Sequence, residues 1–393
     1  MHRYICKGII LITKRIMNQK IKYSFLVLFS SLILFNCSSD GDDMPINDDD
    51  PIEVSPVVFD INAVPYNSLS EYNFFTSPMN DLNPVYGVLP YRPASQLFTD
   101  YAEKKRFVWM PEGASATIEE QDKAIHFPVG TVLIKNFYYE NVQPGNTKKI
   151  IETRLMIRKS DGWIFANYIW NDAQTDAVYD LSGGFVPVEW IQNGETKSIN
   201  YRIPNGNECF MCHYASDSGV PGTTEAPIGP KPQNLNFTIS FSDGNFNQLQ
   251  KLKDFGYISN EIPSNISSVV DYTDSSNSLD MRARSYLEAN CAHCHREGGY
   301  SEFYPIRLNY TANPDYSALG FCLEPNININ GMIDEGHADH IIYPGDHTKS
   351  VIYYRMNTLQ DNIKMPMIGR SIIHTEGVNL INSWIDSFEE GCE

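Results

Sequence analysis

Between residues 101 and 203, short runs of β-branched and aromatic residues alternate with polar turn clusters such as Pro144–Asn146 and Lys159–Gly162. This pattern is typical of strands joined by turns. Several strands at this spacing predict an antiparallel sandwich or barrel. The runs that we expect to form strands are Arg106–Met110, Thr131–Tyr139, Ile150–Arg158, Trp163–Trp170, Val186–Trp190 and Lys197–Ile203.

The chain changes character after Ile203. Residues 219–233 are rich in Gly and Pro, and residues 259–277 are polar and contain Pro, as expected of a loop and a linker. Between them, Asp243 is placed to cap a helix whose apolar positions recur every three residues. Those positions are Phe246, Leu249, Leu252 and Phe255.

The last segment, residues 279–393, has a helical pattern at each end. The first predicted helix, Met281–Asn290, runs directly into Cys291. The second has apolar residues on one face, which predicts a helix packed on a core. They are Val378, Ile381, Trp384, Ile385 and Phe388. We therefore expect an α+β fold, in which a β-rich N-terminal domain precedes a mostly helical C-terminal domain.

Near the N-terminus, the apolar run Ser24–Phe35 follows a stretch that contains lysines. Its length is typical of a secretory signal peptide and short for a membrane span. The residues that end at Cys37 resemble a bacterial lipobox, in which this cysteine becomes the lipidated first residue. We predict a lipoprotein signal peptide over residues 1–36, with Met17 as a possible true start. An ordinary signal peptide with an incidental cysteine is the alternative.

An acidic, Pro-containing stretch follows Cys37. Such a composition cannot pack, so we expect a flexible tether over residues 37–80. The stretch also resembles the acidic signal after the lipidated cysteine in surface lipoproteins of Bacteroidetes. These features predict an outer-membrane lipoprotein that is held by its N-terminal lipid and faces the periplasm or the cell surface.

The composition excludes some classes of partner. The chain is 42% hydrophobic and 12% aromatic, which is enough to bury a sizeable core. Its net charge of −18 argues against nucleic acid, because that binding requires clustered Lys and Arg. A basic protein partner, or solubility alone, remains compatible with the charge.

Two C-x-x-C-H motifs carry the clearest chemistry: Cys209–His213 and Cys291–His295. Two thiols at this spacing reach the two vinyl groups of a heme, and the following His lies under the iron as the proximal ligand. A zinc ribbon or a redox-active dithiol also uses C-x-x-C pairs. The His that follows both copies, and the predicted export, favour two covalently bound heme c groups. Cys209, Cys212, Cys291 and Cys294 are then the anchors, and His213 and His295 the proximal iron ligands.

The second motif has a candidate for the sixth iron ligand. Met365 follows it at about the distance at which class I cytochromes c present a distal Met, and Pro366 stiffens this loop. The alternatives are that Met365 is a packing residue or that another Met takes the role. The other methionines considered are Met367, Met356 and Met332.

The first motif has no equally clear candidate. Neither Met nor His occurs between His213 and Met281, so a sixth ligand must come from upstream or from the C-terminal segment. An open or water-ligated iron fits the sequence equally well. The upstream candidates, each more typical of a packing or surface residue, are Met110, His126 and Met156.

Four further features remain open in the sequence. Cys322 and Cys392 could form a disulfide in an exported protein. The stretch His337–His340 could bind a metal but is more typical of a solvated turn. Met211, inside the first motif, is expected to be a packing residue. Three arginines, any of which could pair with heme propionates, flank the second motif and the Met365 loop: Arg296, Arg355 and Arg370.

From about Ser95 to Phe388, the chain resembles a family of bacterial diheme c-type cytochromes that have a β-rich N-terminal region. The resemblance supports two covalent hemes and a ligand role for Met365, but it implies no substrate. The segments that carry it are Phe127–Lys135, Ile151–Leu155, Trp170–Thr175, Ile228–Lys231, Arg282–Leu287 and Met365–Arg370.

The motifs complete the division of the chain. Residues 1–36 are the expected signal peptide, 37–80 the tether and 81–203 the β-rich domain. Residues 204–278 then form the first heme-binding segment with a linker, and 279–393 a cytochrome c-like domain with the second heme. We expect the two hemes to face each other across the boundary near residues 259–277.

Electron transfer at the outer membrane or in the periplasm, between unidentified redox donor and acceptor proteins, is the function that the sequence favours. The first alternative is a heme enzyme, peroxidase-like or a small-molecule oxidase, in which an open first heme is fed with electrons by the second. The second alternative is a ligand- or glycan-binding module with redox hemes. Fold and heme content do not decide among these.

Overall fold

The computed structural model describes residues 53–219, 222–311, 316–326, 338, 340–389 and 391–392. Residues 54–393 form one compact unit. The predicted signal peptide, Cys37, Met332 and His337 lie outside the described residues. Within the described part of the chain, no helix is long and apolar enough to cross a membrane.

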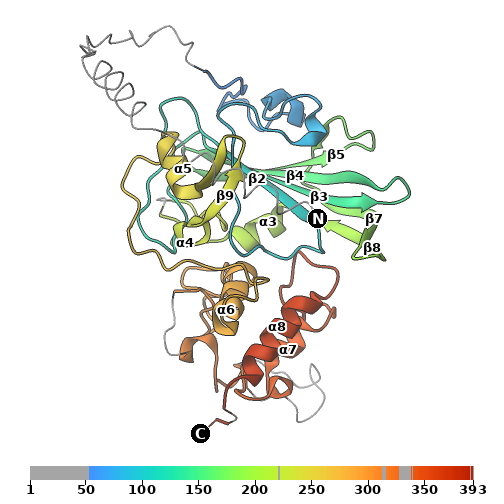
Figure 1. Ribbon diagram of the computed structural model, residues 1–393, viewed down its shortest axis with the longest axis vertical. Helices are drawn as coiled ribbons and strands as arrows, with labels where there is room; N and C mark the ends of the chain where they lie inside the picture. The colour runs from blue at the N-terminus through green and yellow to red at the C-terminus, as the bar shows by residue number, and fades with distance from the viewer. Residues whose placement is uncertain are drawn as a thin grey trace, which may run out of the picture. The chain divides into compact units, whose positions relative to one another are not determined.

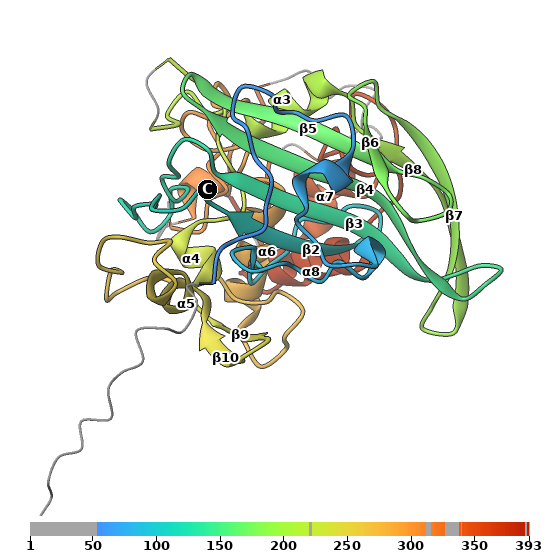
Figure 2. The same ribbon diagram turned by 90° about the horizontal axis from the view of Figure 1, so that it is seen from above.

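The β-rich region is one large antiparallel sheet of eight strands (Figure 1). Strands β1 to β6 follow one another in sequence order, and β7 joins β3 where Val142 pairs with Trp190. Figure 2 shows β2, β3, β4 and β5 side by side, with β7 and β8 towards one end. The strands are β1 (Leu89–Pro90), β2 (Glu103–Trp109), β3 (Val132–Val142), β4 (Thr147–Lys159), β5 (Gly162–Trp170), β6 (Ala177–Tyr179), β7 (Gly184–Gln192) and β8 (Glu195–Ile203).

All six runs that the sequence marked as strands are strands, so the prediction of an antiparallel β-rich region is confirmed. The eight strands, however, hydrogen-bond into a single sheet whose ends β1 and β6 do not pair with each other. It is therefore neither a closed barrel nor two separate packed sheets. The β7–β8 hairpin extends the sheet beyond the end of β2, because β3 is longer than β2 and leaves Val142 free to pair with it.

One face of the sheet is mostly apolar and is covered by the chain that precedes β1. Side chains from β2 to β5 on this face, such as Phe107, Ile134 and Leu155, form a buried cluster with Leu69 and Tyr72. The hydroxyls of Tyr72 and Tyr168 lie 3.0 Å apart in this core. The covering chain contains the 3₁₀ helices η1 (Leu69–Tyr72) and η2 (Met79–Asp81).

This covering chain corrects the end of the expected tether, residues 37–80. The chain from Val54 belongs to the compact unit, and several of its large apolar side chains are buried. The acidic residues that motivated the prediction lie before residue 51, whereas the following stretch carries enough aromatic surface to pack. Examples are Phe74 and Phe75, which are 1% and 5% exposed.

A set of short elements links the sheet to the C-terminal segment. They are α3 (Gly206–His213), α4 (Pro232–Leu235), β9 (Thr238–Phe241), β10 (Gly244–Asn247) and α5 (Gln248–Asp254). The helix expected to start at Asp243 begins only at Gln248. Asn247 caps it by accepting hydrogen bonds from the backbone N–H groups of Leu249 and Gln250. Phe246 instead belongs to a β9–β10 hairpin.

The C-terminal segment contains the two predicted helices, α6 (Leu279–Asn290) and α8 (Thr375–Asp386). They pack together through a buried cluster that includes Leu287, Ile381 and Trp384. Between them lie the short elements η3 (Ser317–Leu319), η4 (His347–Lys349) and α7 (Val351–Met356). Cys322 and Cys392 form a disulfide bond, with their Cα atoms 5.3 Å apart.

Candidate functional site

The first C-x-x-C-H motif forms the second half of α3. Asn205 caps this helix, and Glu208 completes a capping box by accepting a hydrogen bond from the Asn205 backbone at 3.0 Å. The cap fixes where the helix begins, so Cys209 and Cys212 fall one turn apart on it. Both cysteines are free thiols. They are therefore available for the covalent attachment that the sequence predicts.

His213, the last residue of α3, is held in one orientation. Its Nδ1 lies 3.0 Å from the carbonyl oxygen of Ala226, and its ring centroid lies 5.2 Å from that of Phe165 on β5. A bond at Nδ1 leaves Nε2 as the ligand atom. Burial lowers the pKa of His213 to about 4, so the imidazole is neutral at neutral pH, the form that binds iron.

The second motif begins where α6 ends. The carbonyl of Leu287 accepts hydrogen bonds from the N–H groups of Cys291 and Ala292, and the carbonyl of Cys291 accepts one from His295. These bonds close a tight turn that presents Cys291, Cys294 and His295 to a common cavity. Burial lowers the pKa of His295 to about 4, and its Nδ1 has no hydrogen-bond partner among the described residues.

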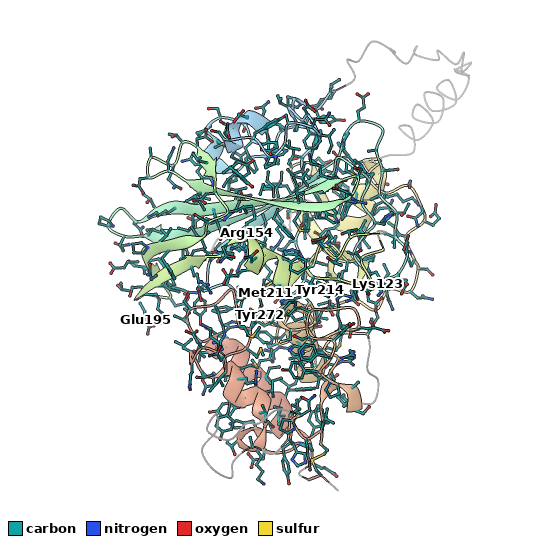
Figure 3. The ribbon with its side chains drawn as sticks, turned by 180° about the vertical axis from the view of Figure 1, so that it is seen from behind. Lys123, Arg154, Glu195, Met211, Tyr214 and Tyr272 are labelled. Atoms are coloured by element: carbon teal, nitrogen blue, oxygen red, sulfur yellow. A yellow bond between two sulfur atoms is a disulfide. The ribbon has the colours of Figure 1, made fainter. Side chains whose placement is uncertain are left out.

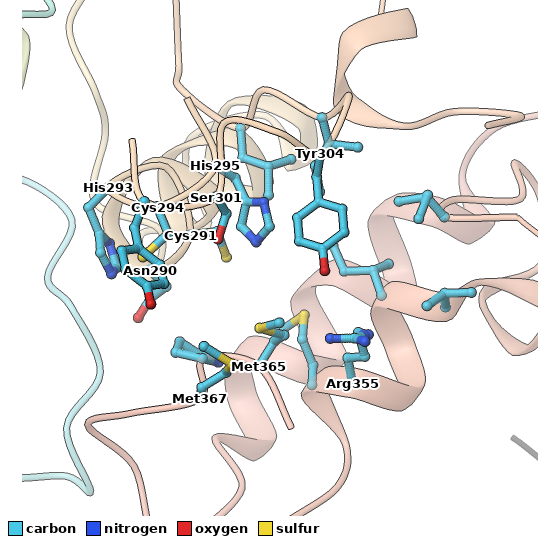
Figure 4. A pocket seen from close by; sticks show the side chains of 18 of the residues that line it. Asn290, Cys291, His293, Cys294, His295, Ser301, Tyr304, Arg355, Met365 and Met367 are labelled. Carbon is cyan, nitrogen blue, oxygen red and sulfur yellow. The ribbon is translucent and has the colours of Figure 1, made fainter. Parts of the chain in front are cut away.

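Figure 4 shows this cavity, with the motif on one side and Met365, Met367 and Arg355 on the other. The remaining wall is mostly apolar, with side chains such as Ile306, Leu308 and Val351. Met365 is held near the cavity because its backbone N–H donates to the carbonyl of Arg355 at 2.7 Å. Two thiols, an imidazole and an opposing thioether in an apolar cavity form a set that fits a covalently bound heme.

Two of the alternative candidates for the sixth ligand of the second motif line the same cavity. Met367 is 41% exposed and Met356 is 7% exposed, the latter as part of the α6–α8 core. Of the arginines, only Arg355 lines this cavity. The Arg370 guanidinium donates to backbone carbonyls, including that of Thr358 at 2.8 Å. Arg296 pairs with Asp217 at 2.7 Å.

The two motifs, distant in sequence, are neighbours in space. The segments that follow the two motifs pair with each other: Ala215 and Gly299 form an isolated antiparallel bridge. Asp217 strengthens this link because it accepts from Arg296 and also pairs with Lys123. The contact is thus made by the residues that follow the motifs, rather than by the expected boundary at residues 259–277.

The second face of the sheet looks into a cavity that the first motif lines. Cys209, Cys212 and His213 line it from α3, and Met156 and Phe165 line it from the sheet. Figure 3 shows Met211 and Tyr214 near the place where the two motifs meet, with Arg154 on the sheet. A second, more polar cavity also reaches His213 and is lined by Lys123, His126 and Asp217, among others.

A row of cations crosses the sheet in the first cavity. Arg106, Lys135 and Arg154 are direct cross-strand partners on β2, β3 and β4, and all three line the cavity. Only Arg154 has a carboxylate partner among the described residues, the buried Glu152. Burial and the neighbouring cations hold the pKa of Lys135 well below its usual value. Like charges placed directly opposite each other destabilise a sheet, so this row favours an anion in the cavity.

The cation row was not predicted from the sequence. A usable signal existed, since Lys135 interrupts an otherwise apolar strand and Arg106 and Arg154 occupy equivalent places in theirs. Without the register of the strands, however, nothing in the sequence brings the three residues together.

The upstream candidates for the sixth ligand of the first motif lie in different places. Met156 lines the cavity on the sheet face, together with His213. His126 is exposed and lines the more polar cavity. Met110 is buried in a cluster with Leu235 and Leu249, and it lines neither cavity.

No group of three or more His, Cys, Asp and Glu side chains in the described part of the chain could hold a bare metal ion. This holds for the two C-x-x-C pairs, although they lie close together. Of the predicted His337–His340 stretch, only Ala338 and His340 are described.

No known family model, curated protein or solved structure matches the chain.

Proposed function

We propose that this protein is a diheme c-type cytochrome that transfers single electrons between redox partners at or near the bacterial outer membrane. The observation that carries the proposal is the pair of C-x-x-C-H motifs, each of which lines a cavity with its two cysteines and its final histidine. When bound, the two hemes supply a one-electron change between ferrous and ferric iron.

In this proposal Cys209 and Cys212 anchor the first heme, and His213 is its proximal ligand. The hydrogen bond from Nδ1 of His213 to Ala226 fixes the tautomer and raises the basicity of Nε2. The row of Arg106, Lys135 and Arg154 binds the propionate groups, because carboxylates supply the anions that this row lacks.

Cys291 and Cys294 anchor the second heme, with His295 as proximal and Met365 as distal ligand. The segment is then cytochrome c-like: α6 leads into the motif, α8 packs on α6, and the loop between them presents the Met. A thioether ligand in an apolar cavity favours the ferrous state and raises the potential. Arg355 is the cavity-lining cation available for a propionate.

The neighbouring motifs support exchange between the two hemes within one chain. Cys212 lines the cavity of the second motif as well as that of the first. Anchors that share a wall place two cofactor edges close together. The chain would accept an electron at one cavity and release it at the other.

Covalent heme content tests this proposal. Holoprotein from a periplasmic host with heme-attachment machinery should contain two covalent hemes per chain in a pyridine hemochrome assay. Replacing Cys209 and Cys212 by Ala should remove one heme, and replacing Cys291 and Cys294 should remove the other. As a matched control, the double Ala variant of Cys322 and Cys392 should retain both. Fewer than two hemes in the unaltered protein would sink the proposal.

A heme enzyme is the second candidate, favoured by the polar cavity beside His213. His126, Lys123 and Asp217 line this cavity and could bind or protonate a small polar substrate. Carbon monoxide or cyanide binding at one heme of the resting protein would favour this candidate. Rapid oxidation and reduction without ligand binding would favour electron transfer.

We further propose that Cys37 carries the lipid that holds the protein at the membrane. The lipobox-like sequence before Cys37 supports this anchor. Cells fed a radiolabelled fatty acid should label the protein, whereas the Cys37→Ser variant should remain unlabelled. Protease treatment of intact cells would then distinguish the cell surface from the periplasm.

A further inference from the structure

The middle residues of the two motifs reach across the junction between them. Met211 lies between Cys209 and Cys212, yet it lines the cavity of the second motif with His295 and Met365. His293 lies between Cys291 and Cys294 and lines the cavity of its own motif, but it also lines both cavities that contain His213. Each motif therefore contributes a side chain to the surroundings of the other.

His293 is the more deeply buried of the two histidines in the second motif. It is 7% exposed, and its Nδ1 has no hydrogen-bond partner among the described residues. A buried polar atom without a partner costs about 1–3 kcal/mol, so such atoms are rare without a ligand or a water. His293 is also free of the role of proximal ligand, since His295 holds that position in its own motif.

From this arrangement, and resting on the proposed function, we infer that His293 is the second axial ligand of the first heme, opposite His213. It is the one His apart from His213 that lines the cavity on the sheet face within the described residues. The proposal makes the first iron bis-histidine and closed to small ligands.

The other candidate ligands of the first heme either make contacts of their own or lie outside this cavity. Met156 packs in an apolar cluster with Leu133 and Trp163. Lys135 lies in the cation row, with its ammonium 4.7 Å from the centre of the Phe137 ring. His126 is exposed, and it lines the polar cavity but not the cavity on the sheet face.

The assignment has two consequences for electron flow. His293 and Cys294 are adjacent in the chain, so one peptide unit would connect the first iron to a thioether of the second heme. A bis-histidine iron also has a lower potential than a His/Met iron in otherwise similar surroundings. Electrons would therefore pass from the first heme to the second.

Low-temperature EPR and near-infrared magnetic circular dichroism of the ferric holoprotein test the assignment. The unaltered protein should show two low-spin irons, one bis-histidine and one His/Met. In His293→Ala, one low-spin signal should become high-spin, and added imidazole should restore it. The matched variant Met156→Leu should keep both low-spin signals.

Two results would overturn the inference: a high-spin or His/Met first heme in the unaltered protein, or unchanged low-spin signals in His293→Ala. Hemochrome analysis of the same samples keeps this result separate from the proposed function. A protein with two covalent hemes and the wrong ligands contradicts the inference alone, whereas a protein without two hemes contradicts the proposed function. Should His293→Ala fail to fold, the spectrum of the unaltered protein still decides.

Discussion

The two motif cavities are built from the same short sequence pattern but differ in the charge of their surroundings. The cavity of the second motif is walled mostly by apolar side chains from the C-terminal segment, with Met365 across from His295. The cavity of the first motif also has many apolar side chains, but the sheet adds three cations to its lining: Arg106, Lys135 and Arg154. In the proposed diheme protein, the C-x-x-C-H pattern would specify attachment, while the side chains that face it would set the charge, the ligand and the potential.

The largest expected effect concerns the ion pair that joins the two regions. The Nζ of Lys231 lies 2.7 Å from Glu288 on α6, and both side chains are at most 9% exposed. Lys231→Met leaves a buried carboxylate unpaired and should lower the free energy of unfolding by about 3–5 kcal/mol, as measured by urea denaturation. Lys197→Met, which breaks an exposed pair with Glu195, should cause a much smaller loss, because solvent screens that pair. Equal losses of unfolding free energy in the two variants would contradict a special stabilising role for the buried pair.

A change of distal ligand should separate the two cavities by potential. Met365→His should lower the potential of one heme by on the order of 100 mV, because axial ligands are the main control of heme potentials. Met367→Leu, two residues away and exposed, should leave both potentials in place. Spectroelectrochemical titration measures both hemes at once. If only the Met367 variant shifts a potential, the two methionines must exchange roles.

The cation row should tune the first heme alone. Removing one positive charge from the lining of the first cavity would stabilise the ferric form of a heme there, so Arg106→Gln should lower one potential by roughly some tens of millivolts. Lys105→Gln is the matched control, because Lys105 is the next residue on β2 and points to the other face of the sheet. A shift in the potentials of both hemes, or of neither, would contradict an effect of the row on the first heme alone.

The smallest expected effect is a pH dependence at the link between the motifs. Burial alone would raise the pKa of Asp217, but hydrogen bonds from Lys123 and Arg296 outweigh it and lower the pKa below its usual value. A lowered pKa in the folded state means that the stability is present above about pH 4 and is lost as the pH falls through the folded pKa. Asp217→Asn should therefore flatten the acid limb of the stability profile.

The exposed pair of Asp361 and Lys364 provides the control for that experiment. Asp361→Asn should leave the acid limb close to that of the unaltered protein, because solvent screens the pair. An acid limb that is the same for Asp217→Asn and the unaltered protein would contradict a structural role for this carboxylate.

Periodicity predicted much of the fold because it reports on local burial. The six strand runs and the two C-terminal helices have apolar residues at the period of their element, and each was found. The short strands β1 and β6 were missed because two or three residues carry too little period to be recognised. The start of α5 was misplaced because the residues after Asp243 pair with β9 as strand β10, so the helix begins only after Asn247.

The candidate site divides in the same way. The cysteines, His213, His295 and Met365 were predicted because their spacing along the chain carries the chemistry. The cation row and the place of His293 depend on contacts between strands or segments that are far apart in sequence. His293 was visible in the second motif, but only the pairing of Ala215 with Gly299 brings it to the first.

The backbone bridge between Ala215 and Gly299 also constrains how such a protein could be assembled in the cell. Cys212 and Cys294 lie next to this bridge and line cavities that close when the sheet, α3 and α6 come together. A prosthetic group as wide as a porphyrin must reach its thiols while these segments are still apart. For a chain that carries two such groups, both attachments would have to precede folding. Export, ligation and folding would then follow a fixed order during biogenesis.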